Sequence, residues 1–469
     1  MGKIKLLDQN DLKKDALFSQ LQGNILKGHG RDFTTNIFIR FDKRREKKVK
    51  EWIATFAENN VTSCKKQLKD NELYKRNKVS GGVFYGFLIS AFGYEYLGLN
   101  TSKFEVSFKT GMKEADLNDP ATSKWDKGFR EEIHAMVLIA DDDREKLGNV
   151  SREIIKELDN FARIVTIEYG NAIRNENKDG IEHFGYVDGV SQPLFFEDEL
   201  ENYVKQNGGK DKFDPSAEKE LVLINDPLID TEDLRFKDVK DAYGSYFVFR
   251  KLEQNVRKFK NDEEKLAGKK NLNLPDEERA GAMLVGRFED GTPIQVSGEE
   301  GMIGSGAFNN FDYDTNDNSK CPFHAHIRKS NPRRDDEDKK HIMARRGIPY
   351  GHRDVPTNVK QDFHQMPEVG VGLLFMSFQR SITNQFEFIQ KKWVNNPTFP
   401  NFDDTKPDGI DPIIGQDGNG NISKGIFPTK YGDDSPSSLK EGSFESAVTM
   451  KGGEYFFAPS ITFLKTLKQ

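Results

Sequence analysis

Two segments of the chain carry residue types that could perform chemistry together. Residues 185–189 read Gly-Tyr-Val-Asp-Gly and place the acid Asp188 between two glycines. Glycine lets the backbone approach a flat ligand closely, so this carboxylate can point into a cavity. Residues 321–333 read Cys-Pro-Phe-His-Ala-His-Ile-Arg-Lys-Ser-Asn-Pro-Arg and supply histidine with basic neighbours. A carboxylate on one side and a histidine on the other predict a metal-containing cofactor held between two parts of the chain.

His326 stands out among the eight histidines because of the residues that follow it. Four basic residues lie within the next eight positions: Arg328, Lys329, Arg333 and Arg334. Guanidinium groups bind carboxylates through paired hydrogen bonds, so this segment suits a cofactor with carboxylate groups, such as haem with its propionates. The alternative is a zinc site at His324 and His326, whose rings would share one face of a strand. No convincing set of further zinc ligands lies nearby in the sequence.

The composition is that of a globular protein with a polar surface. Apolar residues make up 35% of the chain, and 36 Phe with 13 Tyr supply enough apolar area for a sizeable core. A length of 469 residues suits two or three domains. The net charge of −6 is spread along the chain, which argues against nucleic acid as a partner.

Cysteine usage and apolar runs indicate the compartment. Cys64 and Cys321 are too few for a disulfide framework, which favours a reducing environment. Residues 1–11 lack the apolar run of a signal peptide. No segment approaches the roughly 20 apolar residues that a transmembrane helix needs. We therefore expect a soluble, cytoplasmic protein without a membrane partner.

The first half of the chain alternates apolar strands with amphipathic helices. Residues 48–59, for example, repeat apolar side chains at the three- and four-residue spacing of a helix with one buried face. The sequence predicts strands at 36–41, 79–90, 134–140 and 164–169, and helices at 48–59 and 143–161. Successive strand–helix–strand units predict an α+β fold of ferredoxin-like type, in which helices flank an antiparallel sheet.

The second half repeats this theme after a charged, loop-like stretch at 197–241. The sequence predicts strands at 245–250 and 372–379, and helices at 252–266, 276–288 and 383–393. Residues 395–445 are rich in Gly, Pro, Asp and Ser, which predicts a long surface loop. We expect two ferredoxin-like domains, residues 1–215 with Asp188 and residues 216–469 with His326.

Five segments taken together resemble a known family. Residues 185–189 match the GxxDG motif of dye-decolorising (DyP-type) haem peroxidases, and residues 321–333 are similar to the proximal-histidine segment of that family. Residues 342–351 resemble its distal-arginine segment, residues 372–379 its distal-pocket strand and residues 21–30 its N-terminal segment. The ordered set is far more specific than GxxDG alone. The resemblance implies two ferredoxin-like domains with one haem b per chain between them.

The resemblance also implies roles for individual residues. His326 corresponds to the proximal ligand of the haem iron, and Asp188 to the distal acid–base group. Arg345 corresponds to the distal arginine, and the adjacent Arg346 would take this place after a slip of one residue.

Further residues are implied to surround the haem. Gly189 and Arg328 would contact it, while Leu373 and Phe375 would line the distal pocket and restrict access to small oxidants. The family also supplies a carboxylate partner for the proximal histidine from the C-terminal part of the chain, and the candidates here are Asp411 and Glu387.

These residue types suit peroxide chemistry. A histidine that is hydrogen-bonded to a carboxylate is a stronger donor to iron. An acid can remove a proton from bound peroxide and return it to the leaving oxygen, while an arginine stabilises the charge that develops there. The resemblance implies a haem-dependent enzyme that reduces hydrogen peroxide through a ferryl intermediate and oxidises small or bulky organic reductants such as dyes and phenols.

Several alternatives stay open at the level of sequence. One is a haem-binding or haem-processing protein without peroxidase turnover, although storage alone would require neither Asp188 nor Arg345. Trp393 and Tyr350 are candidates for carrying electrons from bulky substrates, and packing is the other interpretation of both. The sequence is compatible with a monomer and with a homodimer.

Overall fold

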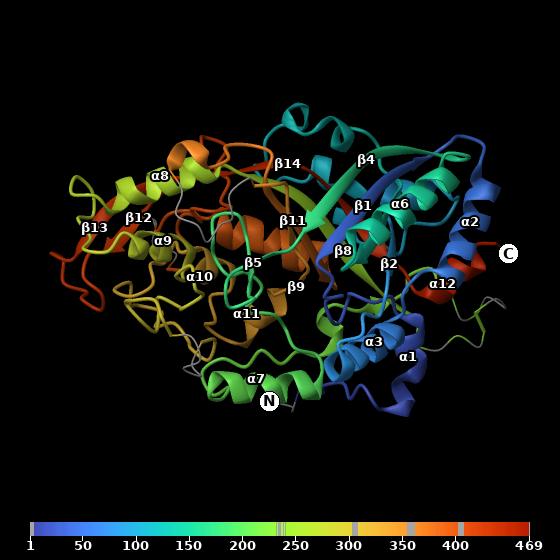
Figure 1. The fold of residues 1–469 in the computed structure, drawn as a ribbon, viewed down its shortest axis with the longest axis horizontal. Helices are drawn as coiled ribbons and strands as arrows, with labels where there is room; N and C mark the ends of the chain where they lie inside the picture. The colour runs from blue at the N-terminus through green and yellow to red at the C-terminus, as the bar shows by residue number, and fades with distance from the viewer. Residues whose placement is uncertain are drawn as a thin grey trace.

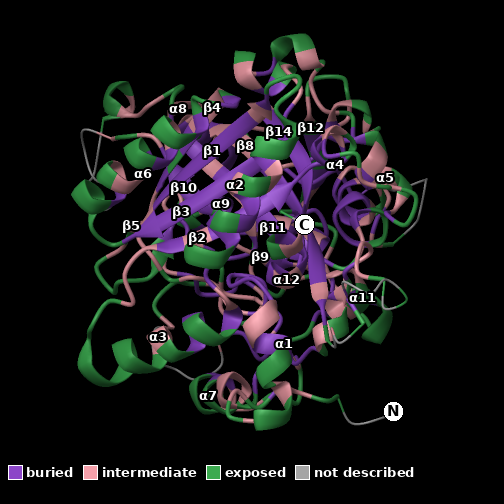
Figure 2. Ribbon diagram, turned by 90° about the vertical axis from the view of Figure 1, so that its right-hand side faces the viewer, coloured by how far each residue is buried: buried purple, intermediate pink, exposed green. Residues whose placement is uncertain are grey.

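The computed structural model describes residues 4–468 apart from 231, 233–235, 238, 240, 303–307, 354–361 and 402–407. Antiparallel strands form the buried centre of the molecule, and the helices pack around them with exposed outer faces (Figure 1; Figure 2). This α+β arrangement is the predicted fold class.

The N-terminal half forms a ferredoxin-like unit. Its elements follow one another as β1 (Phe33–Phe41), α2 (Glu46–Asn59), β2 (Phe84–Ile89), β3 (Ala135–Asp141), α6 (Arg144–Leu158) and β4 (Ala162–Asn171). The strands lie in the order β4-β1-β3-β2, and each neighbouring pair is antiparallel. The predicted strands and helices of this half are confirmed, except that the strand expected at 79–90 begins only at Phe84. The apolar side of each predicted helix packs onto the sheet. In α2 this side includes Val49, Ile53 and Phe56.

The C-terminal half repeats the same topology. Its elements are β8 (Tyr243–Gln254), α8 (Val256–Ala267), β10 (Ile348–Tyr350), β11 (Gly372–Gln379), two π-helical segments (Ile382–Phe386 and Ile389–Val394) and β14 (Val448–Ala458). The strand order is β14-β8-β11-β10, again antiparallel. The helix expected at 252–266 begins only at Val256, because β8 continues to Gln254 and Asn255 caps the helix. Helix α9 (Glu278–Val285) and the short α10 (His326–Ser330) come between α8 and β10 along the chain.

The two sheets join along both edges. Strand β14 pairs with β2 and β10 pairs with β4, so eight strands close into one barrel. Phe38 of β1 and Phe249 of β8 come from opposite sides of this ring, and their ring centroids lie 4.7 Å apart. Aromatic side chains therefore fill the interior, and a large ligand has to bind outside the barrel. Because the halves share this core, the domain boundary expected between residues 215 and 216 stays a prediction.

Two stretches that were expected to be loops contain regular structure. Helix α7 (Glu197–Asn207) occupies the start of the charged stretch, and its acidic first turn complements the helix dipole. Strands β12 (Ile422–Pro428) and β13 (Leu439–Glu445) form a hairpin within residues 395–445. The hairpin buries Phe427 and Phe444. The loop predictions were wrong here because a few apolar residues suffice for these elements, and charged or small residues surround them.

No helix in the part of the chain that the structure describes combines the length and the apolar character needed to cross a membrane.

A buried acid outside the barrel gives the fold a predictable pH dependence. Asp226 accepts hydrogen bonds from the backbone N–H groups of Ser460 (2.8 Å) and Leu228 (3.3 Å), and burial raises the pKa of its carboxyl to about 6. The folded protein therefore keeps a proton that the unfolded chain releases near pH 4. This contribution to stability is present below pH 4 and is lost as the pH rises through 6, amounting to roughly 3 kcal/mol.

We expect Asp226→Asn to remove this part of the pH dependence. Urea unfolding of the wild type and the variant at several pH values between 4 and 7 measures it. The stability difference between the two proteins should change with pH over this window and level off above it. Parallel stability curves would show that Asp226 does not keep its proton in the folded state.

Candidate functional site

A cavity of about 580 Å³ lies outside the barrel, against β8 and β11. Its other walls come from residues 24–31, from the loop at 180–192, from α10 and from residues 342–349. Eight of the residues singled out from the sequence line this one cavity: Asp188, Gly189, His326, Arg333, Arg345, Arg346, Leu373 and Phe375. Residues separated by up to 187 positions thus meet around one space that is large enough for a sizeable cofactor.

His326 begins α10 and pairs with a buried acid. Its Nδ1 lies 2.7 Å from Oδ2 of Asp411, whose other oxygen accepts hydrogen bonds from the backbone N–H groups of Ile413 and Ile414. Burial alone would lower the pKa of His326, but the charge and the hydrogen bond of Asp411 outweigh it and raise that pKa. The pair occupies Nδ1, so Nε2 is the ring nitrogen that remains for a ligand in the cavity.

The structure therefore distinguishes between the two carboxylates that were candidates for the partner of His326. Glu387 accepts hydrogen bonds from the hydroxyl groups of Tyr455 (3.1 Å) and Ser107 (3.0 Å) and does not line the cavity. Asp411 is the partner of His326, and Glu387, the other candidate, is neither that partner nor part of the cavity wall. In sequence the two acids were equivalent, because only the fold decides which one reaches the imidazole.

Arg328 is also placed differently from the expectation. Its guanidinium is buried and donates to the carbonyl oxygens of Asp314 (2.6 Å), Asp317 (2.8 Å) and Cys321 (2.5 Å). These bonds fasten the loop before α10, and Arg328 does not line the cavity. Its side chain points away from His326 because residues two positions apart lie on different sides of a helix.

Arg333 and Arg287, unlike Arg328, are among the arginines that line the cavity. The guanidinium of Arg333 stacks on Phe213 and Phe311, with 3.8 Å and 4.1 Å to the ring centroids. Arg333 (2.7 Å) and Arg287 (3.1 Å) both donate to Oδ1 of Asn309. Burial and the charge of Arg333 lower the pKa of Arg287 to about 9. Arg333 was among the basic residues noted in the sequence, whereas Arg287 was missed because it stands alone after α9.

Three of the arginines that line the cavity are not hydrogen-bonded to any acid that the structure describes. Within the described ranges, the hydrogen-bond partners of Arg287, Arg333 and Arg345 are carbonyl, amide and hydroxyl oxygens, and none is a carboxylate. A guanidinium that is shielded from water and lacks a hydrogen-bonded acid is stabilised by an anion, so this part of the cavity favours an anionic ligand group. A flat apolar ring system with carboxylate arms, such as haem, fits these walls and the imidazole of His326.

Asp188 lies in a loop that is ordered by its own backbone. Its N–H donates to the carbonyl of Gly180 (3.0 Å), and its Oδ1 accepts from the N–H of Gly189 (2.6 Å). Gly189 has φ +78°, a conformation that side-chain-bearing residues rarely adopt. The turn therefore requires this glycine and leaves the Asp188 carboxylate facing the cavity.

Glu182 is a second acid of this loop, and sequence reasoning missed it. Its carboxylate faces the cavity and accepts hydrogen bonds from the backbone N–H groups of Phe184 (2.8 Å) and Tyr186 (3.0 Å). Burial raises the pKa of Glu182 to about 7. Its hydrogen bonds hold together the turn that presents Asp188, and the only available signal was its place six residues before that acid.

The adjacent arginines Arg345 and Arg346 differ in what their guanidinium groups bind. Arg346 donates to the carbonyl oxygens of Asn24 (2.7 Å), Ile25 (2.8 Å) and Arg345 (2.7 Å), so its guanidinium ties the N-terminal segment to the cavity wall. Arg345 makes one side-chain hydrogen bond in the described part of the chain, from Nη2 to the carbonyl of Ser191 (3.2 Å). Its remaining donors are therefore left for a ligand, which favours the Arg345 register over Arg346.

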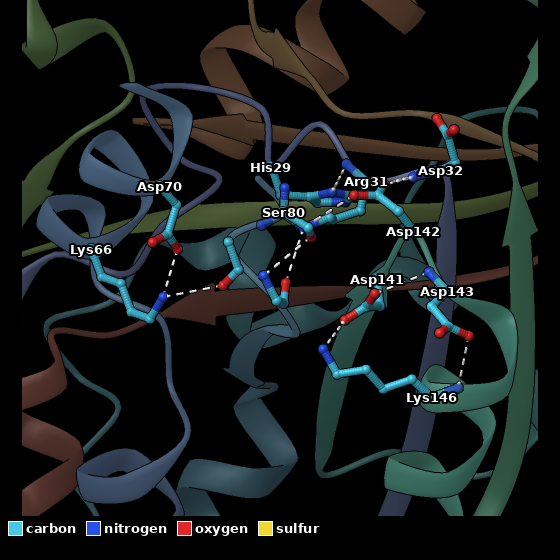
Figure 3. Close-up of polar contacts among 12 residues, drawn as sticks. His29, Arg31, Asp32, Lys66, Asp70, Ser80, Asp141, Asp142, Asp143 and Lys146 are labelled. Atoms are coloured by element: carbon cyan, nitrogen blue, oxygen red, sulfur yellow. Dashed lines mark hydrogen bonds and ion pairs between the residues drawn. The ribbon is translucent and has the colours of Figure 1, made fainter. Parts of the chain in front are cut away.

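The N-terminal segment brings a neutral histidine to the cavity wall. His29 lines the cavity, and its Nδ1 accepts a hydrogen bond from the N–H of Arg31 (3.0 Å). Burial, and then the charges of Arg31 and Arg346, lower the pKa of His29 to about 3. Figure 3 shows how Asp142 lies beside Arg31 and accepts the backbone N–H of Asp32 (3.1 Å). His29 was not singled out, although residues 21–30 resemble the family.

Strand alternation directs two apolar side chains into the cavity. Leu373 and Phe375 of β11 line it, whereas the intervening Leu374 and the next residue, Met376, are fully buried in the barrel core. Successive strand residues point to opposite faces, so one strand serves both the core and the cavity.

The histidine pair proposed for zinc does not converge. His324 is buried with its ring edge-on to Phe427, 4.5 Å between centroids, whereas His326 faces the cavity. No group of three potential metal ligands of the His, Cys, Asp and Glu types gathers among the described residues. Trp393 and Tyr350 are both buried, and a role in carrying electrons stays a prediction.

Comparison with known proteins identifies the family. A family model described as the DyP dimeric alpha+beta barrel domain matches residues 20–174, and one described as Dyp-type peroxidase, C-terminal, matches residues 217–403. The multifunctional dye peroxidase DyP2 of Amycolatopsis sp. is 40% identical over 464 residues, which cover 96% of each chain. Peroxidase 2 of Mycetinis scorodonius is 31% identical and covers 80% of this chain and 74% of its own.

Solved structures agree with this result. The DyP-type peroxidase AnaPX of Anabaena sp. superposes with a TM-score of 0.88 at 41% identity, covering 98% of this chain and 97% of its own. DyP2 of Amycolatopsis sp. superposes with a TM-score of 0.90 at 39% identity over 99% of both chains. The chain therefore belongs to the family of dye-decolorising, DyP-type haem peroxidases.

Proposed function

We propose that this chain binds one haem b and uses it to reduce hydrogen peroxide at the expense of organic reductants such as dyes and phenols. The observation that carries the proposal is the convergence of the His326–Asp411 pair with Asp188 and Arg345 on one cavity. Nε2 of His326 would hold the iron, and Arg287 and Arg333 would hold the propionates. The names of the dye peroxidases among the relatives support dyes as substrates.

Haem, when bound, supplies an iron centre that accepts peroxide and takes up its oxidising equivalents. Asp411 accepts a hydrogen bond from Nδ1 of His326, which would make the imidazole a stronger electron donor to the iron. Asp188 would take a proton from one oxygen of hydrogen peroxide and return it to the other, which then leaves as water. Arg345 donates hydrogen bonds to that leaving oxygen as it gains negative charge. Leu373 and Phe375 narrow the space around these groups, so bulky molecules stay outside it.

Haem storage or processing without turnover is the competing function. Haem storage would use His326, Arg287 and Arg333. It would require neither the carboxylate nor the arginine that face the same cavity. Asp188 and Arg345 thus favour the enzyme. The setting is proposed to be the cytoplasm, consistent with the free thiols of Cys64 and Cys321, and the assembly a monomer or homodimer.

Hemin reconstitution tests the proposal. We expect the purified chain to keep a Soret band after desalting, and one equivalent of hydrogen peroxide to change that band within seconds. His326→Ala should lose the band faster during desalting, because the axial bond is missing. His364→Ala, at an exposed position outside the cavity, is the control and should behave as the wild type.

Two results would contradict this function in different ways. A wild-type chain that emerges colourless does not bind haem, and the proposal fails. A chain that keeps its haem while peroxide leaves the spectrum unchanged fits the storage function instead.

A further inference from the structure

Lys329 is a buried cation next to the proposed iron ligand. It lies on α10 one turn after His326, and none of its surface is exposed. Its ammonium group donates to the carbonyl oxygens of Asn396 (2.5 Å) and Trp393 (3.4 Å). Burial lowers the pKa of Lys329 to about 7, and the negative charges of Asp411 and Asp408 act in the opposite direction.

The turn at residues 393–396 that receives Lys329 also holds Asp411. The backbone N–H of Asp411 donates to the carbonyl of Val394 (3.0 Å), which lies between the two carbonyls that Lys329 binds. The side chain of Asn395 is fixed as well, by its hydrogen bond to the carbonyl of Leu117 (2.9 Å). This turn therefore binds both Lys329 and Asp411 through its backbone carbonyl groups.

These contacts close a ring around the histidine–carboxylate pair. The ring runs from His326 to Asp411, from Asp411 to the turn at 393–396, from this turn to Lys329, and along α10 back to His326. A shift of α10 relative to Asp411 would break at least one of these hydrogen bonds. The ring thus fixes the position of the imidazole relative to the carboxylate.

We propose that Lys329 is a positioning residue that holds α10 in register with Asp411. Its positive charge also sets how much negative charge the His326–Asp411 pair presents to the cavity. The oxygens of Asp411 are bound by backbone N–H groups and by the imidazole. Lys329 is the cation of α10 with which the negative charge of Asp411 interacts. In a buried site such a charge is weakly screened and acts over several ångströms. This inference rests on the proposed function, because the imidazole is taken as the iron ligand.

Three variants separate charge from positioning. Lys329→Met keeps the length of the side chain but removes the charge and both hydrogen bonds. Lys329→Gln removes the charge and keeps a donor, and Lys329→Arg keeps both. Lys251→Met is the matched control: Lys251 is a largely buried lysine paired with Glu168 and Asp126, and it does not line the cavity.

The readouts are the Fe(III)/Fe(II) midpoint potential and the iron–histidine stretching band of the ferrous, hemin-loaded proteins. Measured below pH 6, where Lys329 with its pKa of about 7 is protonated, Lys329→Met and Lys329→Gln should both lower the potential, because a positive charge near iron favours the ferrous state. Lys329→Met should in addition shift or broaden the stretching band, because the register of α10 is released. Lys329→Arg and Lys251→Met should match the wild type in both measurements.

The outcomes distinguish this inference from the proposed function. If the wild type fails to hold haem, the proposed function fails. If the wild type holds haem and both neutral variants keep its potential and its stretching band, Lys329 is only a packing residue and the inference is overturned. Where Lys329→Met does not fold, Lys329→Gln decides the matter, since an unchanged potential in that variant refutes the effect of charge.

Discussion

Replacing Asp188 with asparagine should lower kcat/KM for hydrogen peroxide by roughly 10²–10⁴-fold, the usual contribution of a general acid–base group. The amide has the same size and can still accept the hydrogen bond from the N–H of Gly189, so the loop should keep its shape. It cannot take up a proton from peroxide. Haem content and thermal stability are expected to stay at the wild-type level, because the side chain faces the cavity.

Stopped-flow measurement of the reaction with peroxide checks this result. Asp179→Asn is a suitable control, because this exposed acid lies on the same segment but outside the cavity. A rate in Asp188→Asn within a few-fold of the wild type would mean that another group moves the proton. Glu182 would then be the next candidate, since its carboxylate faces the same space.

Arg345→Leu should lower the same rate by roughly 10²–10³-fold, the usual effect of removing one preorganised donor to a developing negative charge. The folded state should hardly change, because Arg345 makes only one side-chain hydrogen bond to the described part of the chain, to the carbonyl of Ser191. The defect should therefore appear in the reaction with peroxide and not in the unfolding curve.

The neighbouring arginine provides the contrast. Arg346→Leu leaves the carbonyl oxygens of Asn24, Ile25 and Arg345 without their donor, which should lower the free energy of unfolding by roughly 3 kcal/mol. Its effect on the folded enzyme should be smaller than that of Arg345→Leu. If Arg346→Leu is stable but inactive while Arg345→Leu is active, the two roles are reversed.

Local patterns were sufficient where the signal lies in neighbouring residues. The apolar spacing of 48–59 predicted α2, and the apolar run of 372–379 predicted β11 with its bounds. Strand β14 was missed because Gly452 and Gly453 interrupt its apolar residues, and its β-structure comes from pairing with β8. The hairpin of β12 and β13 was missed for a similar reason.

The main residues of the site could also be predicted from the sequence, but the side chains that surround and support them could not. Asp188, His326 and Arg345 could be named from motifs, and all three line the cavity. The choice of Asp411 over Glu387, and of Arg333 over Arg328, depends on which side chains face the cavity or the imidazole after folding. Sequence distance carries no information on this point.

Residue types and motifs were enough to infer the chemistry of the protein: an acid between two glycines, a histidine among basic residues and an arginine in a segment that resembles a family motif. How these groups are supported became visible only after folding, because each support is a contact between distant segments. Asp411 reaches His326 across 85 positions, and Arg346 reaches Asn24 across 322. Such contacts arise when the two half-sheets close into one barrel and bring both halves of the chain to the same cavity.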